Sequence, residues 1–403
     1  MNADILFEIL DAADGRKVGV AVLNRPQILN GLSLEMSRTL DQQLRQWEVD
    51  DSIALVVLTS KGDKAFCAGG DLHRLYASMQ EAVPGDPWSN EYAREFFAVE
   101  YRLDYLIHRY SKPVLCWGSG IVMGGGVGLM MGASHRVGTE TTRFAMPEIT
   151  IGVFPDVGGT WMLERLPAGI GMFLALTGAQ LGAADCRHLG LIDYCLYSAG
   201  WPAVTQALCQ TEWSDDRHEN DVLLDKLLRS MSVSDIGAPG PLQKHYERIA
   251  EQCDGPDLEA ICAGLAAWCD SSDPWLARAA QTFVHGSPGS ARLSFELQKR
   301  ARRMSLAQVF QMEYTAMIQR AASADFKEGI RALLIDKDMT PAWNPASIQE
   351  TDRKWVEQFF EPAWPAHLEH PLANLEKDSP RQARRQGLSA TRSGKTEHTG
   401  SAT

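Results

Sequence analysis

Short apolar, β-branched runs alternate with helical patterns over the first half of the chain, and this alternation limits the fold more than any other feature. Buried strands are predicted at VGVAVLN (18–24), IALVVLTS (53–60) and PVLCWGSG (113–120). Amphipathic helices are predicted between them at 33–50 and 91–110. Strands that alternate with helices build βα units, whose strands lie mostly parallel. The sequence therefore predicts an α/β core over residues 1–198.

The rest of the chain has a different character. Helical patterns without an intervening strand pattern run through 199–350, as in DVLLDKLLRSM, LEAICAGLAAWCD and the long stretch from Ser290 to Ala322. We expect this helical region to pack on the core. Residues 351–403 form a terminal segment, and from about residue 370 it is rich in Ser, Thr, Gly and charge, which is typical of a flexible tail.

Composition and charge exclude several classes of protein. The net charge is −12, from 39 basic and 51 acidic residues, which argues against a general binder of nucleic acid or of anionic membranes. No uncharged apolar run reaches the roughly 18 residues of a membrane helix, and no basic leader precedes the first strand, so we expect a cytoplasmic location. The eight cysteines are scattered singly without zinc spacing, which predicts reduced thiols and no metal site.

Two glycine-rich turns follow predicted strands. In GIVMGGGVGL, Gly124, Gly125 and Gly126 open an apolar helix, and in KAFCAGGDL, Gly69 and Gly70 follow the strand at 53–60. Glycines that begin a helix leave backbone N–H groups free at the positive end of its dipole, with no Cβ to block a ligand. Close packing of helix on strand is the ordinary explanation of one such run. One donor from each of two turns would suit a developing oxyanion.

Two carboxylates stand among apolar residues, prolines and glycines in RFAMPEITIGVFPDVGG (143–159). Burying an unpartnered carboxylate costs several kcal/mol or forces it to take up a proton, so Glu148 and Asp156 need an explanation. Eight residues separate them, ~26 Å at full extension. They can share one site only if the chain reverses, for which Gly152 and Pro155 are suited. In a poorly hydrated pocket, one of the pair should then have a raised pKa.

These motifs, in this order and spacing, resemble the crotonase (enoyl-CoA hydratase/isomerase) superfamily. The motifs are LNRPQILNGLSLEM, KAFCAGGDL, GIVMGGGVGL and FAMPEITIGVFPDVGGTWMLERLP. Within the superfamily the 3-hydroxyisobutyryl-CoA hydrolase branch is the most similar, because FFAVEYRLDYLIHRYSKPV and DFKEGIRALLIDKDMTPAWNP also resemble it. The resemblance covers about residues 5–350. It implies a crotonase-like ββα superhelix, or spiral, followed by a helical C-terminal region.

The resemblance also implies roles for particular residues. The two N–H groups of the oxyanion hole map onto Gly70 and Gly125, and the catalytic carboxylates map onto Glu148 and Asp156. A further substrate-contacting glutamate maps onto Glu100, so that Glu100, Gly125, Glu148 and Asp156 are expected to bind the substrate. The first catalytic glutamate of the hydratases falls at Gly128 here, which argues against ordinary hydratase activity.

The expected reaction is hydrolysis of a short-chain 3-hydroxyacyl-CoA thioester, with 3-hydroxyisobutyryl-CoA from valine breakdown as the first candidate. No cofactor is implied, because coenzyme A is part of the substrate, and no metal ion is implied either. Assembly into a homo-oligomer is possible in this superfamily. A crotonase-type hydratase or isomerase, with Glu148 as a lone proton shuttle, is the alternative enzyme, and a protein that binds CoA without turnover is a third hypothesis.

Each residue also has a structural interpretation. Asp156 would suit the cap of a helix beginning near GTWMLERL, and Glu148 would suit a first helical turn. Glu100 lies in an amphipathic stretch, where a solvated face is the ordinary expectation. The basic cluster of Lys299, Arg300, Arg302 and Arg303 fits either a solvated helix face or a site for the 3′-phosphate of CoA.

Overall fold

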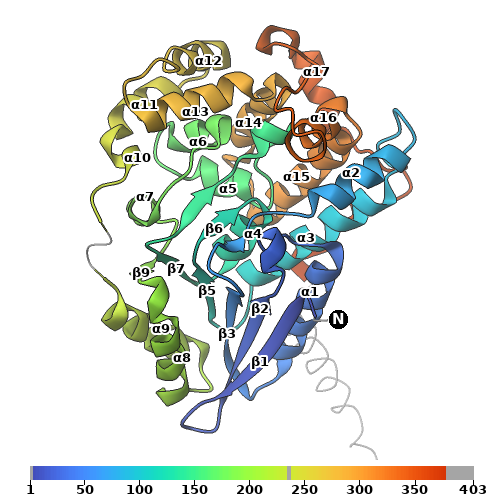
Figure 1. Cartoon of the computed structure of the whole chain (residues 1–403). Coiled ribbons are helices and arrows are strands. Elements are labelled where there is room, and N and C mark those ends of the chain that lie inside the picture. The colour runs from blue at the N-terminus through green and yellow to red at the C-terminus, as the bar shows by residue number, and fades with distance from the viewer. Residues whose placement is uncertain (1–2, 234–236, 378–403) are drawn as a thin grey trace, which may run out of the picture.

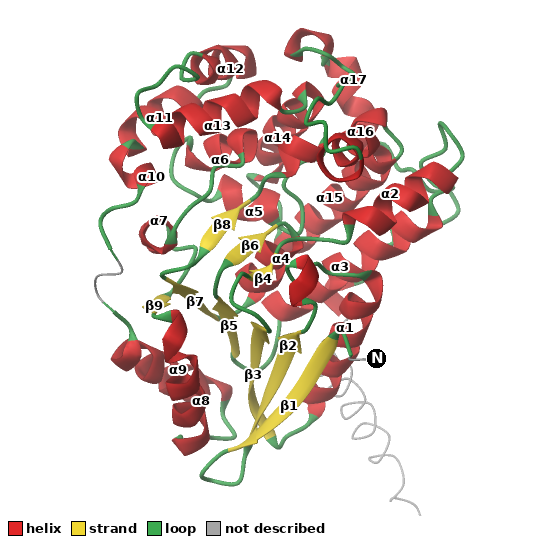
Figure 2. Cartoon of the chain, in the orientation of Figure 1, coloured by secondary structure: helices red, strands yellow, loops and turns green. Residues whose placement is uncertain are grey.

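The computed structural model describes residues 3–233 and 237–377. Its strands form two sheets (Figure 2), one of six strands in the order β1-β2-β3-β5-β7-β9 and one of three in the order β4-β6-β8. The first sheet contains β1 (Ile5–Asp11), β2 (Lys17–Leu23), β3 (Ile53–Ser60), β5 (Val114–Gly118), β7 (His135–Thr139) and β9 (Tyr194–Leu196). The second contains β4 (Ala65–Cys67), β6 (Ile121–Met123) and β8 (Arg143–Ala145).

The two sheets are built by a repeated ββα turn. The pairs β3–β4, β5–β6 and β7–β8 each add one strand to the large sheet and one to the small sheet. Apart from the antiparallel β1–β2 hairpin, neighbouring strands in both sheets are parallel. This is the spiral expected from the sequence, and the predicted strands at 18–24, 53–60 and 113–120 correspond to β2, β3 and β5.

Helices follow each turn of the spiral and then form most of the chain after β9. Those of the first half are α1 (Leu34–Val49), α2 (Leu72–Glu81), α3 (Glu91–His108), α4 (Gly125–Gly132), α5 (Gly159–Glu164), α6 (Ile170–Thr177) and α7 (Ala183–His188). Those of the second half are α8 (Trp201–Gln210), α9 (Arg217–Met231), α10 (Pro241–Lys244), α11 (Tyr246–Cys253), α12 (Leu258–Ala266), α13 (Pro274–His285), α14 (Pro288–Ala301), α15 (Leu306–Ala321), α16 (Ala324–Ile330) and α17 (Arg353–Glu357). No helix of the described residues has the length and apolar composition needed to cross a bilayer.

Apart from the partly exposed edge strand β1, the large sheet is buried on both faces because helices from different parts of the chain cover each one. Along β2, Val18, Val20 and Val22 pack with α8 and α9 in one core, whereas Ala21 and Leu23 belong to the larger core on the other face. Alternate side chains of a strand point to opposite faces, which explains this division. Figure 1 shows α8 and α9 beside the lower part of the sheet and α10 to α17 gathered at the other end of the molecule.

The larger core runs without interruption from the first strand to the last described helices. The helical C-terminal region therefore shares its core with the spiral. Residues 370–377, expected to begin a flexible tail, belong to this packed body: Leu372 and Leu375 are buried, and the Leu372 carbonyl accepts a hydrogen bond from Gln311 on α15. The apolar residues at 372 and 375 anchor this segment despite its polar composition. The rest of the expected tail, 378–403, lies outside the described residues.

Candidate active site

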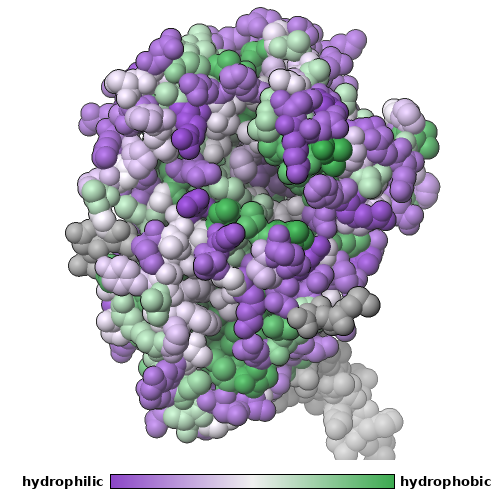
Figure 3. Space-filling view, in the orientation of Figure 1, coloured by the Kyte–Doolittle hydropathy of each residue, from purple (hydrophilic) through white to green (hydrophobic). Residues whose placement is uncertain are grey.

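The two glycine-rich turns lie against each other in the fold. Gly69 and Gly124 both have positive φ angles, +110° and +51°, and their backbones approach so closely that a Cβ on Gly124 would lie 3.3 Å from the Gly69 Cα. A side chain at either position would be strained or would separate the turns. A hollow opens on this face of the molecule between α16 and α4 (Figure 3). The glycines therefore bring two stretches of backbone together.

The N–H groups of Gly70 and Gly125 have no hydrogen-bond partner among the described residues. The carbonyl of Gly69 and the N–H of Asp71 both pair with Leu32, which fixes the backbone on either side of Gly70. Gly125 is the first residue of α4, where N–H groups lack intrahelical acceptors. Two unpaired donors thus stand at neighbouring turns, which is the arrangement that an oxyanion requires.

The chain reverses between Glu148 and Asp156, as the sequence predicts. Glu148 begins a four-residue 3-10 helix (Glu148–Ile151), and its C-cap residue Gly152 has a φ angle of +77°. The N–H of Val153 then returns to the carbonyl of Glu148. Both acids are buried, and Oε1 of Glu148 lies 3.3 Å from the Cβ position of Gly124. Glu148 therefore points to the glycine turns, with Asp156 close enough for its charge to act on it.

Burial raises the pKa of both acids, and the two are raised unequally. The pKa of Asp156 rises to about 6 through burial, opposed by a hydrogen bond of 2.6 Å from the Tyr101 hydroxyl. The pKa of Glu148 rises well above its usual range through burial and then through the charge of Asp156. The sequence predicted a raised pKa for one of the pair, and both are raised because both side chains are buried.

Asp156 does not cap a helix, contrary to its structural interpretation. The helix in question, α5, begins at Gly159 with Gly158 as its N-cap residue, and no side chain of that turn caps it. Its first N–H groups are instead bound by Glu313 of α15: Gly158 donates to Oε2 (2.8 Å) and Thr160 to Oε1 (3.0 Å). The Asp156 carboxylate is left to face Tyr101.

Glu100 lies inside the protein and not on a solvated helix face. Its side chain is 3% exposed, and Oε1 approaches Gly125 so closely that a Cβ there would collide with it. That oxygen has no hydrogen-bond partner among the described residues. Burial and then the charge of Asp156 raise its pKa well above the usual range. Glu100 thus joins Glu148 and Asp156 beside the glycine turns.

Two further buried acids were missed by sequence reasoning. Asp104, one helical turn after Glu100 on α3, is fully buried, and burial followed by the charge of Glu100 raises its pKa well above the usual range. Glu313 is also fully buried, and burial raises its pKa to about 8. Each is the only charged residue in a short, mostly apolar stretch of its helix, LDYLI for Asp104 and FQMEYTAM for Glu313. That is the same signal that identified Glu148, applied to helices.

Gly128 has no room for a side chain. A Cβ there would lie 2.7 Å from Oδ2 of Asp104 and 2.8 Å from Cβ of Val157. The place where hydratases of the superfamily were expected to carry a glutamate is therefore filled from α3 and from the segment after Asp156.

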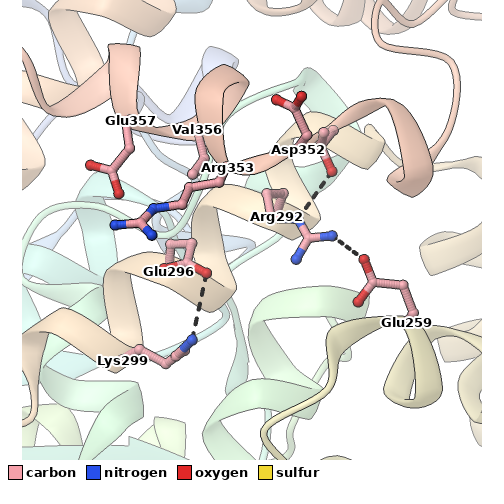
Figure 4. A pocket seen from close by; sticks show the side chains of 9 residues that line it. Glu259, Arg292, Glu296, Lys299, Asp352, Arg353, Val356 and Glu357 are labelled. Atoms are coloured by element: carbon pink, nitrogen blue, oxygen red, sulfur yellow. Dashed lines mark hydrogen bonds and ion pairs between the residues drawn. The ribbon is translucent and has the colours of Figure 1, made fainter.

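Three residues of the basic cluster, which lies at the C-terminal end of α14 and just after it, form separate ion pairs. Lys299 pairs with Glu296 (3.6 Å), Arg300 with Glu357 (2.8 Å) and Arg302 with Glu164 (3.7 Å). A surface pocket of about 490 Å³ lies beside them, and its lining mixes acids and cations (Figure 4): Glu259, Arg292, Glu296, Lys299, Thr351, Asp352, Arg353, Val356 and Glu357. Four carboxylates in one lining disfavour a phosphate.

Comparison with known proteins identifies the family of the chain. The model of the enoyl-CoA hydratase/isomerase family matches residues 18–360. The chain belongs to this family. Among family members it is similar to the 3-hydroxyisobutyryl-CoA hydrolase, mitochondrial, of Xenopus tropicalis, with 38% identity over 85% of this chain and 86% of the relative. It is also similar to the protein of the same name from Danio rerio, with 37% identity over 89% of this chain and 90% of that one.

A solved structure of the family has the same fold. The carnitinyl-CoA dehydratase from Mycobacterium thermoresistibile aligns with a TM-score of 0.77 and 34% identity, over 90% of this chain and 97% of that chain. The crotonase-like fold and the hydrolase branch predicted from the sequence are thereby confirmed.

The expectation of a cytoplasmic location is wrong on this comparison, because the similar hydrolases from Xenopus tropicalis and Danio rerio are named mitochondrial. A targeting signal lies outside the folded enzyme and can be removed, so folded residues carry no record of the compartment.

Proposed function

We propose that this protein hydrolyses the thioester of a short-chain 3-hydroxyacyl-CoA, with 3-hydroxyisobutyryl-CoA as the substrate and 3-hydroxyisobutyrate and CoA as the products, a step of valine breakdown. One observation carries the proposal: two buried carboxylates, Glu148 and Asp156, stand beside two backbone N–H groups that have no partner in the described protein. The names of the similar hydrolases support the choice of substrate.

The N–H groups of Gly70 and Gly125 polarise the thioester carbonyl. As an oxygen nucleophile attacks the carbonyl carbon, negative charge develops on the carbonyl oxygen, and two preorganised donors stabilise that charge. Gly125 adds the positive end of α4. Removal of one such donor typically costs about 100- to 1000-fold in kcat.

Glu148 and Asp156 manage the protons. Water loses a proton as its oxygen bonds to the carbonyl carbon, and the CoA sulfur gains a proton as the C–S bond breaks, so the reaction needs a group that first accepts and then donates. Glu148, beside the turns, is the acid that meets the reacting atoms. Asp156, ionised above about pH 6, lies beside Glu148 and takes up and returns a proton as the C–S bond breaks. The pair thus supplies an acid and a base from one residue class.

Glu148 has two routes open to it, and isotope labelling separates them. As a general base it activates water, and all product oxygen derived from solvent comes directly from that water. As a nucleophile it forms a mixed anhydride, and when water then attacks the Glu148 carboxyl carbon of that anhydride, the first turnover carries an enzyme oxygen into the product. A single turnover in H₂¹⁸O, followed by mass spectrometry of the acid product, detects this route as a product without the label. Neither route needs a cofactor, since CoA leaves as a product.

The test is thiol release from a panel of 3-hydroxyacyl-CoA esters, with 3-hydroxyisobutyryl-CoA among them. Glu148→Gln and Asp156→Asn should each lower kcat by about 100-fold or more, the usual contribution of a positioned acid or base. Asp185→Asn is the matched control, because Asp185 is another fully buried carboxylate and lies on α7, where it binds the N–H groups of Leu242 and Gln243. Full activity in Glu148→Gln would contradict the proposal.

A second function is favoured by one observation, the dehydratase name of the similar solved structure. A hydratase acting on crotonyl-CoA would consume the enoyl absorbance without releasing thiol. The crowding at Gly128 argues against it, since the hydratases' glutamate does not fit there. Binding of CoA with no change in either substrate would instead indicate a protein without turnover.

A further inference from the structure

We propose that α15, in the helical C-terminal region, fixes the spacing of the catalytic acids, with Glu313 and Arg320 as its two positioning residues. These two residues bind the two ends of the segment from Gly152 to Gly158, which carries Asp156. This inference rests on the proposed function, because it assigns a purpose to two residues that do not themselves meet the substrate.

The two residues stand on one face of α15. They are seven positions apart, which is close to two turns of an α-helix, so their side chains project in nearly the same direction. The axial distance between them is about 10.5 Å. Phe310 lies on the same face and packs against the segment as well, since a Cβ on Gly158 would lie 3.1 Å from its ring. A single rigid element thus contacts the segment at several points.

Glu313 holds the end after Asp156. Both of its carboxylate oxygens accept backbone hydrogen bonds, from Gly158 at 2.8 Å and from Thr160 at 3.0 Å. No side chain of the segment itself supplies this cap. The two acceptors fix the backbone two residues after Asp156, and the backbone of Asp156 is fixed in turn by a bond from Gly159 to its carbonyl.

Arg320 holds the end before Asp156. Its Nε donates to the carbonyl of Gly152 at 2.6 Å, the residue at which the chain reverses after Glu148. Its Nη2 pairs with Asp325 at 2.7 Å and donates to Ser287 at 3.0 Å. The N–H of Ser287 in turn donates to the carbonyl of Ile149, next to Glu148. This network therefore reaches both sides of the reversal.

Burial argues that this arrangement has a purpose beyond stability. Arg320 and Asp325 have fully buried side chains, as does Glu313. Desolvation of a buried ion pair offsets most of its attraction, so apolar residues of similar volume would often stabilise the fold as well. Charged groups do what apolar residues cannot: they bind backbone N–H and C=O groups at two defined points. Those points bracket Asp156.

The test combines hydrogen exchange with kinetics in the full-length protein. Glu313→Gln keeps the shape of the side chain but presents an amide N–H₂ to one of the two N–H donors. Arg320→Lys keeps the charge but loses the fork that binds Gly152, Ser287 and Asp325 together. Asp185→Asn removes a comparable buried carboxylate that binds the N–H groups of Leu242 and Gln243, away from the site.

We expect faster amide exchange in peptides covering 148–160 for both α15 variants. For Asp185→Asn we expect exchange in these peptides at the wild-type rate. We also expect kcat to fall by about 100-fold, the effect of a misplacement of about 1 Å, with KM close to that of the wild type. Unchanged exchange in 148–160 would overturn the proposal that α15 holds this segment. Faster exchange with unchanged kcat would overturn the proposal that α15 positions the catalytic acids. If one variant fails to fold, the other gives the same readouts. A wild-type protein that releases no thiol would overturn the proposed function, while exchange would still decide whether α15 holds the segment.

Discussion

Replacing Tyr101 by Phe should shift the pH dependence of hydrolysis, because the Tyr101 hydroxyl stabilises the ionised form of Asp156. The hydroxyl donates to Oδ2 at 2.6 Å between two buried side chains. Burial raises the pKa of Asp156 to about 6, and this bond opposes the rise. A hydrogen bond to a charged group contributes about 1.5–3 kcal/mol, and 1.36 kcal/mol corresponds to one pKa unit. Its loss should therefore raise the Asp156 pKa to roughly 7–8.

The sign follows from the role of Asp156 as a proton acceptor. Activity is lost as the pH falls through the pKa of Asp156, so the variant loses activity at a higher pH than the wild type. If the pKa is ~7.5, about a quarter of Asp156 is ionised at pH 7, so kcat/KM falls about 4-fold there and recovers near pH 9.

The assay is kcat/KM for thiol release from about pH 5 to about pH 9, which reports groups of the free enzyme. Tyr314→Phe is the control, since the Tyr314 ring packs beside Tyr101 but its hydroxyl donates to the carbonyl of Arg94. The reasoning is refuted if the acid limb of Tyr101→Phe stays where the wild type has it.

Three further predictions concern other residues of the site. Glu148→Gln should lower thiol release by at least about 100-fold while CoA still binds, measured by calorimetry; loss of binding would point to a structural role. Asp104→Asn should gain stability relative to the wild type as the pH rises from pH 5 to pH 8. Burial and the charge of Glu100 raise the pKa of Asp104 in the folded protein, so the carboxyl group stabilises the wild type at low pH and this stabilisation is lost as the pH rises. Denaturant midpoints of the variant and the wild type at both pH values check this, and the same difference between the two proteins at each pH would contradict it. Gly124→Ala should cost about 1–2 kcal/mol through its positive φ angle and crowd Glu148, lowering kcat. Gly200→Ala, where a Cβ meets nothing within 4 Å, is its control, and equal effects in the two variants would count against the glycine turn.

Much of the fold was predictable because its strands are short and apolar and its helices are amphipathic. The predicted helices at 33–50 and 91–110 are α1 and α3, differing only at their ends. The long helical pattern from Ser290 to Ala322 is in fact two helices, α14 and α15, because Ser305 begins the second with a capping box. The anchoring of residues 370–377 could not be predicted, since it depends on where α15 lies in space.

The site was predictable where the local sequence carries the geometry. Glu148 and Asp156 stand out because apolar residues and glycines surround them, and the reversal at Gly152 needs a left-handed residue. Glu313 and Arg320 lie more than 150 residues later, and their partners are backbone groups that any residue possesses. No local pattern encodes such a contact. Glu100 was carried over from the resemblance, and its burial became visible only once α3 was packed against α4 and α15.

The most direct test of the account is a crystal structure of Asp156→Asn with 3-hydroxyisobutyryl-CoA bound. The account predicts the thioester oxygen at about 2.7–3.1 Å from the backbone nitrogens of both Gly70 and Gly125, with the Glu148 carboxylate facing the carbonyl carbon. A thioester bound elsewhere, or one whose oxygen meets neither nitrogen, would contradict it.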